Sequence, residues 1–428
     1  MPAMMLWRER RLLSVLVLLY FAQGLPSGLL AKAVPALARE AGMPLPHIGL
    51  LSLAALPWAL KFIWAPWVDH LGLGRANHRK RWIITCQLGA AGIMVCVAML
   101  EPAWLFTTDF LLLVGLLGLL NLFCATHDIA ADGLAVRMLP PALRGPGNGI
   151  QVFGYKAGLI IGGGILLMWI GLAGWRATFL MVALVLLMML LAVGRYPEPA
   201  AGAVPGKRLG AGEAARALVG FWWRPGMFWW LLLLLGYKVG DSFGSRMLKP
   251  MLIDQGWSLF QVGRLDVVAS LAGLVATLAG GLWLLRLHRL RGVLLFGAMQ
   301  ALAFSGWAAL AAMPSPPAGA IWAAALFEQC ADALATVVLF TLMMDYCRPG
   351  REGADYTLQA AMQVSAAGLF TLGSGFSAAG LGYAGHFLLS ALLCALAIMA
   401  APCWWRAFRR HPQTRPDTFR MHDDRPAP

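Results

Sequence analysis

The chain has 428 residues, of which 60% are hydrophobic and only 13% are charged, whereas soluble domains carry about 25% charged residues. This composition excludes a water-soluble globular protein and indicates a polytopic membrane protein. The net charge of +14 comes from short basic clusters between apolar runs, which argues against a nucleic-acid-binding protein.

Twelve apolar runs are long enough to cross a bilayer, which takes about 20 residues each. The first follows Arg8, Arg10 and Arg11, and its length favours an uncleaved helix over a signal peptide. The predicted fold is therefore an all-α integral membrane protein with twelve transmembrane helices. Their predicted bounds are 12–31, 46–66, 82–100, 105–137, 148–170, 174–195, 227–250, 260–285, 292–313, 317–345, 356–380 and 383–403.

A polar, proline-containing stretch from Tyr196 to Arg224 separates six of these runs from the other six. Two internal repeats support two similar halves: Gly24 and Gly28 recur as Gly240 and Gly244, and Arg144-Gly145 leading to Gln151 recurs as Glu352-Gly353 leading to Gln359. The predicted domains are a six-helix half over 1–195, a basic cytoplasmic linker over 196–226, a six-helix half over 227–405 and a cytoplasmic tail over 406–428.

The distribution of lysine and arginine predicts the orientation of the chain. Most of these residues fall in segments that face inward if both termini are cytoplasmic. We therefore expect a multi-pass protein with both termini in the cytoplasm.

Charged residues inside the spans of the second half need a physical reason, because each costs about 2.5–3.5 kcal/mol at the centre of a bilayer. Lys238 and Asp241 are three residues apart and share a helix face. They are either a locally neutralised pair or a pair that opens when an anion binds Lys238. Glu328 and Asp332 are four apart, and two such close carboxyls cannot both ionise cheaply. One of them either carries a proton or accepts hydrogen bonds from a neighbouring helix.

The first half offers a similar set of residues. Lys156 has no acidic neighbour within its own helix turn, so it needs a counter-ion from another helix or from a solute. Asp128 and Asp132 lie lower in the fourth run, and His127 beside them is expected to make an interfacial hydrogen bond rather than to relay protons.

A charged loop follows the second run. Asp69 precedes the cluster Arg79-Lys80-Arg81, and charge pairing between them could lock the inward side of two helices. Simple anchoring by positive charge would explain the three cations but not Asp69.

The two sixes of helices and the loop from Asp69 to Arg81 resemble the major facilitator superfamily, although His70 stands where Arg is usual and the loop is longer. Four motifs are similar to the branch that contains muropeptide permeases of the AmpG type, acetyl-coenzyme A transporters and ferric siderophore permeases. They are Leu60-Lys61-Phe62-Ile63-Trp64-Ala65-Pro66, His127-Asp128-Ile129-Ala130-Ala131-Asp132-Gly133, Gly154-Tyr155-Lys156-Ala157-Gly158 and Tyr237-Lys238-Val239-Gly240-Asp241.

This resemblance implies a proton-driven importer of the bacterial inner membrane that works by alternating access. Permeases of the AmpG type usually have additional carboxyl-terminal spans, whereas twelve are predicted here. The expectation therefore tilts toward a permease for ferric siderophores of the pyochelin or rhizobactin type, with muropeptide import as the alternative. A polytopic membrane transferase is the remote alternative, and a sensor that binds solute without moving it also stays open. We expect no enzyme activity, no metal and no cofactor, an anionic small-molecule solute, the lipid bilayer as the other partner, and a monomer.

The resemblance and the charge pattern together select the candidate site residues. The substrate-binding candidates are Gln23, Tyr155, Lys156, Tyr237, Lys238 and Gln329; the proton-coupling candidates are Asp241, Glu328, Asp332, Asp128 and Asp132; and the gating candidates are Asp69, Arg79, Lys80 and Arg81.

Overall fold

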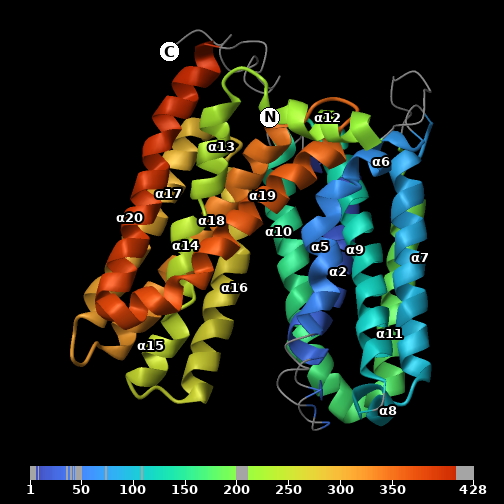
Figure 1. Ribbon diagram of the computed structural model, residues 1–428, viewed down its shortest axis with the longest axis horizontal. Helices are drawn as coiled ribbons and strands as arrows, with labels where there is room; N and C mark the ends of the chain where they lie inside the picture. The colour runs from blue at the N-terminus through green and yellow to red at the C-terminus, as the bar shows by residue number, and fades with distance from the viewer. Residues whose placement is uncertain are drawn as a thin grey trace. The chain divides into compact units, whose positions relative to one another are not determined.

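The computed structural model describes residues 6–7, 9–34, 37–38, 41, 43, 51–72, 75–107, 109–198 and 211–410. Within these ranges the chain forms helices and turns but no strand (Figure 1). Among the described residues, eight helices are long and apolar enough to cross a membrane, or up to nine if one bent pair is a single span. Shorter or kinked helices supply the rest of the twelve predicted spans. The linker cations Lys207 and Arg208 and the tail from residue 411 lie outside the described ranges.

The chain divides into two compact units. The first unit comprises Met1–Leu139, Ile150–Leu218 and Arg348–Leu358, and the second comprises Pro140–Gly149, Val219–Cys347 and Gln359–Pro428. Each unit therefore holds a short connector from the other half of the sequence. These connectors contain the predicted repeat pair Arg144-Gly145 and Glu352-Gly353. The predicted domain bounds and the cytoplasmic location of the linker remain predictions.

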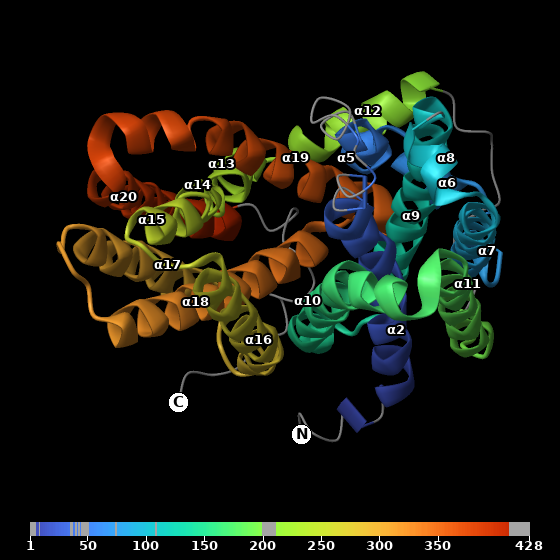
Figure 2. The ribbon, with the colours of Figure 1, turned by 90° about the horizontal axis from the view of Figure 1, so that it is seen from below.

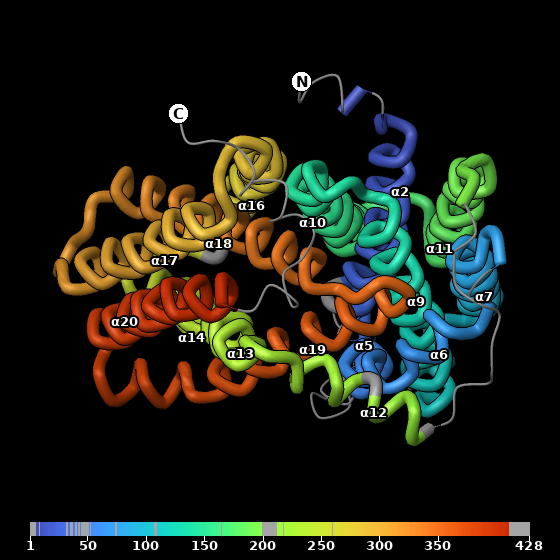
Figure 3. Tube along the Cα trace, turned by 90° about the horizontal axis from the view of Figure 1, so that it is seen from above, coloured from blue at the N-terminus to red at the C-terminus, as the bar shows by residue number. Residues whose placement is uncertain are grey.

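The first unit packs its long helices around an apolar core that includes Met94, Leu120 and Val182. Figure 3 shows α7 beside α11, and α7 also packs against α9. The elements of this unit are α2 (Arg10–Gly28), η1 (Leu29–Ala33), η2 (Leu51–Ala55), α5 (Leu56–Leu60), η3 (Lys61–Ile63), α6 (Ala65–His70), α7 (His78–Met99), α8 (Pro102–Thr107), α9 (Phe110–Met138), most of α10 (Arg144–Ile160), η5 (Ile161–Ile165), α11 (Leu166–Gly194) and most of α12 (Ala211–Trp222).

The span predicted over 46–66 differs most from a single helix. Its described part consists of η2, α5, η3 and, after a further break, the first residues of α6. Pro57 and Pro66 lie in the first turns of α5 and α6, where a missing N–H is tolerated but the preceding helix cannot continue regularly. These breaks place Lys61 at the start of η3.

Glycines let α2 lie directly against α10 and η5. A Cβ added to Gly24 would fall 2.1 Å from the Tyr155 carbonyl oxygen, and one added to Gly162 would fall 1.9 Å from that of Leu25. Backbone is in contact with backbone here, so a larger residue has no room.

The second unit has the same kind of core, with Phe304, Trp307 and Phe387 among its fully buried side chains. Figure 2 shows α17 beside α18 and α20, and α16 also packs against α18. The elements of this unit are η4 (Pro141–Leu143), α13 (Met227–Gly236), α14 (Val239–Ser245), α15 (Leu248–Asp254), α16 (Leu259–Trp283), α17 (Arg289–Ala311), α18 (Ala318–Tyr346), most of α19 (Glu352–Leu372) and α20 (Ser374–Arg410).

Two helices contain matching breaks. α11 changes direction at Gly174 (φ 79°, ψ 172°) and α20 at Gly382 (φ 68°, ψ 171°). Only glycine adopts this backbone conformation readily. These glycines separate the fifth predicted span from the sixth and the eleventh from the twelfth, so the two halves repeat at the level of backbone geometry.

Candidate functional site

Lys238 is the centre of a buried charge cluster in the second unit. It lies at the break between α13 and α14, and its Nζ is 2.7 Å from Asp241 Oδ2 and 2.5 Å from Asp332 Oδ1. The same Nζ donates a hydrogen bond to Gln300 Oε1 at 3.1 Å. The pair expected from the spacing of Lys238 and Asp241 is therefore formed, and a carboxylate from α18 joins it.

Glu328 lies one helix turn before Asp332 on α18 and is 3% exposed. Gln329 Nε2 donates a hydrogen bond to Glu328 Oε2 at 3.0 Å. Asp332 also accepts from the Thr336 hydroxyl at 3.4 Å. Three carboxyls thus lie near one buried lysine, so full ionisation would leave excess negative charge in a medium of low dielectric constant. The cluster has the composition needed to hold or release a proton.

Lys61 forms the corresponding ion pair in the first unit, with Asp128 Oδ2. Its Nζ also lies 4.5 Å from the centre of the Trp58 ring, which favours a cation. Asp132 accepts hydrogen bonds from the Tyr20 hydroxyl at 2.8 Å and from Gln151 Nε2 at 3.2 Å. Lys61 is not among the candidate residues predicted from the sequence, although its position as a lysine inside a predicted span was the available signal.

The remaining substrate-binding candidates are dispersed. Gln23 Nε2 lies 3.3 Å from His127 Nδ1, and both residues are buried. The Tyr155 ring lies 6.5 Å from that of Trp58, and Lys156 is partly buried on α10. The Tyr237 hydroxyl donates to the Val293 carbonyl at 2.8 Å and is thus already engaged within the second unit. Solute binding by these residues remains a prediction.

The gating candidates converge on Arg79, which is 1% exposed. Its Nη2 lies 2.9 Å from Asp69 Oδ1 and 2.7 Å from Glu352 Oε2. Asp69 also accepts backbone hydrogen bonds from Gly353 at 3.2 Å and Ala354 at 2.6 Å. Asp69 and Arg79 thereby hold the connector Arg348–Leu358 at the first turn of α19. We call the side chains of Asp69, Arg79 and Glu352 the first gate cluster.

Burial has a measurable consequence at Asp69, which follows the second predicted span. Loss of hydration raises the pKa of its carboxyl to about 6, although Arg79 and the Ala354 N–H both lower that pKa. The carboxylate is thus the favoured form at neutral pH but can be protonated under mildly acidic conditions.

The other two cations of the loop behave differently. Lys80 Nζ donates to the carbonyls of Gly194 at 2.5 Å and Tyr196 at 3.1 Å. Its backbone N–H donates to Glu198 Oε2 at 3.0 Å, so Lys80 fastens the end of α11. Arg81 is exposed. Of the cluster Arg79-Lys80-Arg81, Arg79 is the member placed in the first gate cluster.

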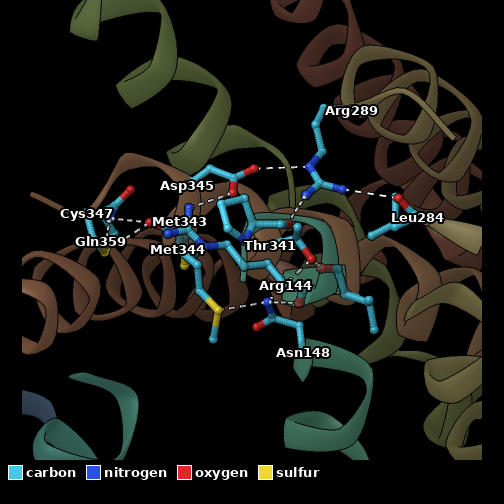
Figure 4. Close-up of polar contacts among 12 residues, drawn as sticks. Arg144, Asn148, Leu284, Arg289, Thr341, Met343, Met344, Asp345, Cys347 and Gln359 are labelled. Carbon is cyan, nitrogen blue, oxygen red and sulfur yellow. Dashed lines mark hydrogen bonds and ion pairs between the residues drawn. The ribbon is translucent and has the colours of Figure 1, made fainter. Parts of the chain in front are cut away.

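A second gate cluster was not expected from the sequence. Asp345, near the end of α18, lies 3.0 Å from Arg144 Nη1 and 3.0 Å from Arg289 Nε, and its side chain is fully buried (Figure 4). Asn148 Nδ2 donates to the Thr341 hydroxyl at 3.4 Å. The connector Pro140–Gly149 is thus tied to the second unit, as the other connector is tied to the first, but with the positions of acid and base exchanged.

No metal site is evident in the described ranges, where no three His, Cys, Asp or Glu side chains are grouped to hold an ion. The arrangement offers proton and anion chemistry, through two buried lysine–carboxylate clusters.

The sequence is similar to those of known transporters. Residues 12–170 match the family model described as acetyl-coenzyme A transporter 1. The chain is 27% identical over 355 residues to the anhydromuropeptide permease of Escherichia coli K12, covering 82% of this chain and 70% of that protein. It is 24% identical over 401 residues to a putative transporter, AmpG 4, of Rickettsia conorii, covering 91% of this chain and 95% of that protein.

A solved structure shows the fold. The major facilitator proton:xylose symporter XylE superposes with a TM-score of 0.68 at 13% identity, covering 91% of this chain and 94% of that chain. The comparisons give no support to the ferric siderophore expectation, and they fit the muropeptide alternative better. The chain is a multi-pass membrane protein with the major facilitator fold, similar in sequence to transporters of the AmpG and acetyl-coenzyme A group.

Proposed function

We propose that this protein is a proton-coupled permease of the bacterial inner membrane that imports a muropeptide-like solute. The observation that carries the proposal is the similarity to the anhydromuropeptide permease of Escherichia coli over 82% of the chain. The buried cluster around Lys238 supports proton coupling, because intramembrane ionisable groups that pair with one another commonly mark solute and proton pathways.

The cluster suggests how a proton and an anion are linked. A proton that binds Asp332 or Glu328 removes one negative charge near Lys238, which then attracts the carboxylate of a solute. Release of that proton restores the pairing between Lys238 and Asp332 and favours release of the solute. Lys61 and Asp128 supply a second pair that can respond to charge in the same manner.

The two gate clusters supply a means of alternating access. Each holds a connector at the side that the charge distribution predicts to be cytoplasmic, through Arg79 with Glu352 and through Arg144 with Asp345. Breaking these ion pairs would free the connectors and open that side.

The test uses an Escherichia coli strain that lacks its own anhydromuropeptide permease and expresses this chain. We expect it to accumulate radiolabelled anhydromuropeptide and to lose accumulation when a protonophore is added. Glu328→Gln should abolish accumulation but preserve exchange of labelled for unlabelled solute. The absence of uptake, with the protein present in the membrane, would overturn the proposed substrate.

Acetyl-coenzyme A is a second candidate solute, because the family model over residues 12–170 carries that name. Proteoliposomes loaded with an acidic or a neutral interior would be supplied with labelled acetyl-coenzyme A, labelled anhydromuropeptide or a labelled ferric siderophore. Accumulation of acetyl-coenzyme A alone would favour this candidate over the proposed one.

A further inference from the structure

The second unit contains a large cavity, lined by both polar and apolar side chains, that none of the gates or lysine clusters uses. It has a volume of about 470 Å³ and lies among α14, α15 and α19. This volume falls within the roughly 300–1,000 Å³ typical of small-molecule sites. The cavity is therefore large enough to receive part of a solute rather than a single ion.

The lining of this cavity is chemically suited to an anion. Arg246 and Lys249 contribute two positive charges, and the described lining residues include no acidic side chain, although Asp266, outside this lining, pairs with Lys249. Ser242 and Ser245 add hydroxyl donors, and Gln363, which is 7% exposed, adds an amide. Arg can donate two parallel hydrogen bonds to one carboxylate, and Lys supplies a mobile point charge.

Lys249 also connects this cavity to the proton-coupling candidates. It lines an adjoining cavity of about 70 Å³ together with Asp266, Glu328 and Gln329. Its Nζ lies 3.0 Å from Asp266 Oδ1, and both side chains of that pair are about half exposed. An exposed pair of this kind contributes little stability, so a solute carboxylate can compete with Asp266 for Lys249.

We propose that the cavity bounded by Arg246, Lys249, Ser242, Ser245 and Gln363 is a binding site for carboxylate groups of the transported solute. This assignment rests on the proposed function and adds a place where an anionic solute is held beside the Glu328 cavity. It also differs from the earlier candidates, because neither Arg246 nor Lys249 belongs to the cluster around Lys238.

The test measures binding to the full chain in nanodiscs of neutral lipid. The probes are an anhydromuropeptide with free peptide carboxylates and the same compound with its carboxylates amidated. We expect the free acid to bind about tenfold more tightly, a factor that corresponds to one good charged hydrogen bond. Arg246→Gln and Lys249→Gln should each remove most of this preference. The control Arg264→Gln removes the same charge from an exposed position on α16 and should retain it.

A second variant tests the cavity by volume instead of charge. A Cβ on Gly368, which lines the cavity, meets open space, so Gly368→Leu can fold while filling the site. We expect it to weaken binding of the free acid. Gly306 on α17 also faces open space outside the cavity, and Gly306→Leu should bind like the wild type.

Three outcomes would overturn the assignment. One is that Arg246→Gln, Lys249→Gln and Gly368→Leu all bind the free acid like the wild type. Another is that anionic phospholipid in the nanodisc displaces the solute only when Arg246 is present, which would assign the cavity to a lipid headgroup.

The third outcome needs another probe. If the wild type binds neither the free acid nor the amidated anhydromuropeptide, the proposed solute is wrong, and the anion site is then tested with citrate. A rise in unfolding temperature with citrate that Arg246→Gln and Lys249→Gln abolish, and Arg264→Gln does not, would uphold the anion site alone. The absence of that rise would overturn the site as well.

Discussion

At the scale of single residues, the buried ion pair between Lys61 and Asp128 is expected to contribute strongly to the stability of the fold. Each side chain is 6% exposed, so removing one partner leaves an uncompensated charge in a low-dielectric environment. We expect Lys61→Met to lower the free energy of unfolding by about 3–5 kcal/mol. Denaturant unfolding in detergent would measure this loss.

A double substitution distinguishes the stability lost by leaving Asp128 unpaired from the stability lost by removing the Lys61 side chain. Lys61→Met combined with Asp128→Leu should recover much of the lost stability, because no charge is then left buried. The exposed pair of Lys249 with Asp266 is the control, and Lys249→Met should cost less than about 1 kcal/mol. If Lys61→Met is as mild as that control, Lys61 does not neutralise Asp128.

Asp69 predicts a pH dependence. Its pKa is about 6 in the folded protein and near 3.8 when hydrated, so the folded state binds the proton more tightly. Its contribution to stability is therefore complete below pH 3.8 and is lost as the pH rises through 6. Between pH 7 and pH 5 the wild type should gain about 1 kcal/mol relative to Asp69→Asn. A constant difference between the two proteins over this range would contradict the assignment.

The sequence could reveal some of these pairs and not others. Lys238 and Asp241 are three residues apart, so helix geometry alone places them together. Lys61 and Asp128 are far apart in the chain, and a single sequence carries no signal for pairing between separate helices. For the same reason Glu352 could not be assigned to Arg79, which the sequence did not distinguish from Lys80 and Arg81 as a gating candidate.

At the scale of elements, the feature that most readily gives a test is the break in a helix. Gly174 and Gly382 have positive φ with extended ψ, a conformation that costs other residues about 1–3 kcal/mol. Space is open around Gly174, so Gly174→Ala should lose this amount through backbone strain alone. Gly171→Ala, in a regular helical turn with similar open space, should be neutral or stabilising. Thermal unfolding of both variants distinguishes strain from packing.

The twelve-helix fold was predictable because apolar runs of sufficient length have few alternatives in a bilayer. The breaks inside individual spans could not be predicted from the sequence. The seventh predicted span is three short helices, α13, α14 and α15, with breaks next to Lys238 and Met247. Hydropathy does not register such breaks, since the residues on both sides remain apolar. They matter because one of them positions Lys238 between two carboxylates.

At the scale of the whole molecule, each half of the sequence contributes a short connector to the unit formed mainly by the other half. Arg348–Leu358 belongs to the first unit and Pro140–Gly149 to the second. Each connector begins the helix that follows it, so an ion pair at its start also positions α10 or α19. The repeat of Arg144-Gly145 in Glu352-Gly353 was visible in the sequence. The oppositely charged partners that hold each copy, Asp345 and Arg79, could be identified only in the structure.

The gate clusters therefore predict how access to one side of the protein is controlled. Cys347 lies immediately before the connector Arg348–Leu358, and its Sγ is 3.2 Å from the Met343 carbonyl oxygen. In a variant that retains Cys347 as the sole cysteine, Glu352→Gln weakens the contact of Arg79 with that connector. Loss of one charged hydrogen bond corresponds to about a tenfold change in the population of the open gate.

We expect maleimide added to inside-out vesicles to label Cys347 about tenfold faster in Glu352→Gln. Glu101→Gln, which removes the same charge from an exposed position before α8, is the matched control and should label at the original rate. Equal rates in all three proteins would mean that Asp69 and the backbone N–H groups of Gly353 and Ala354 hold the connector without help from Glu352. A faster rate only in Glu352→Gln, suppressed by added solute, would instead link release of this connector to the transport cycle, because solute then selects the state in which the connector is held.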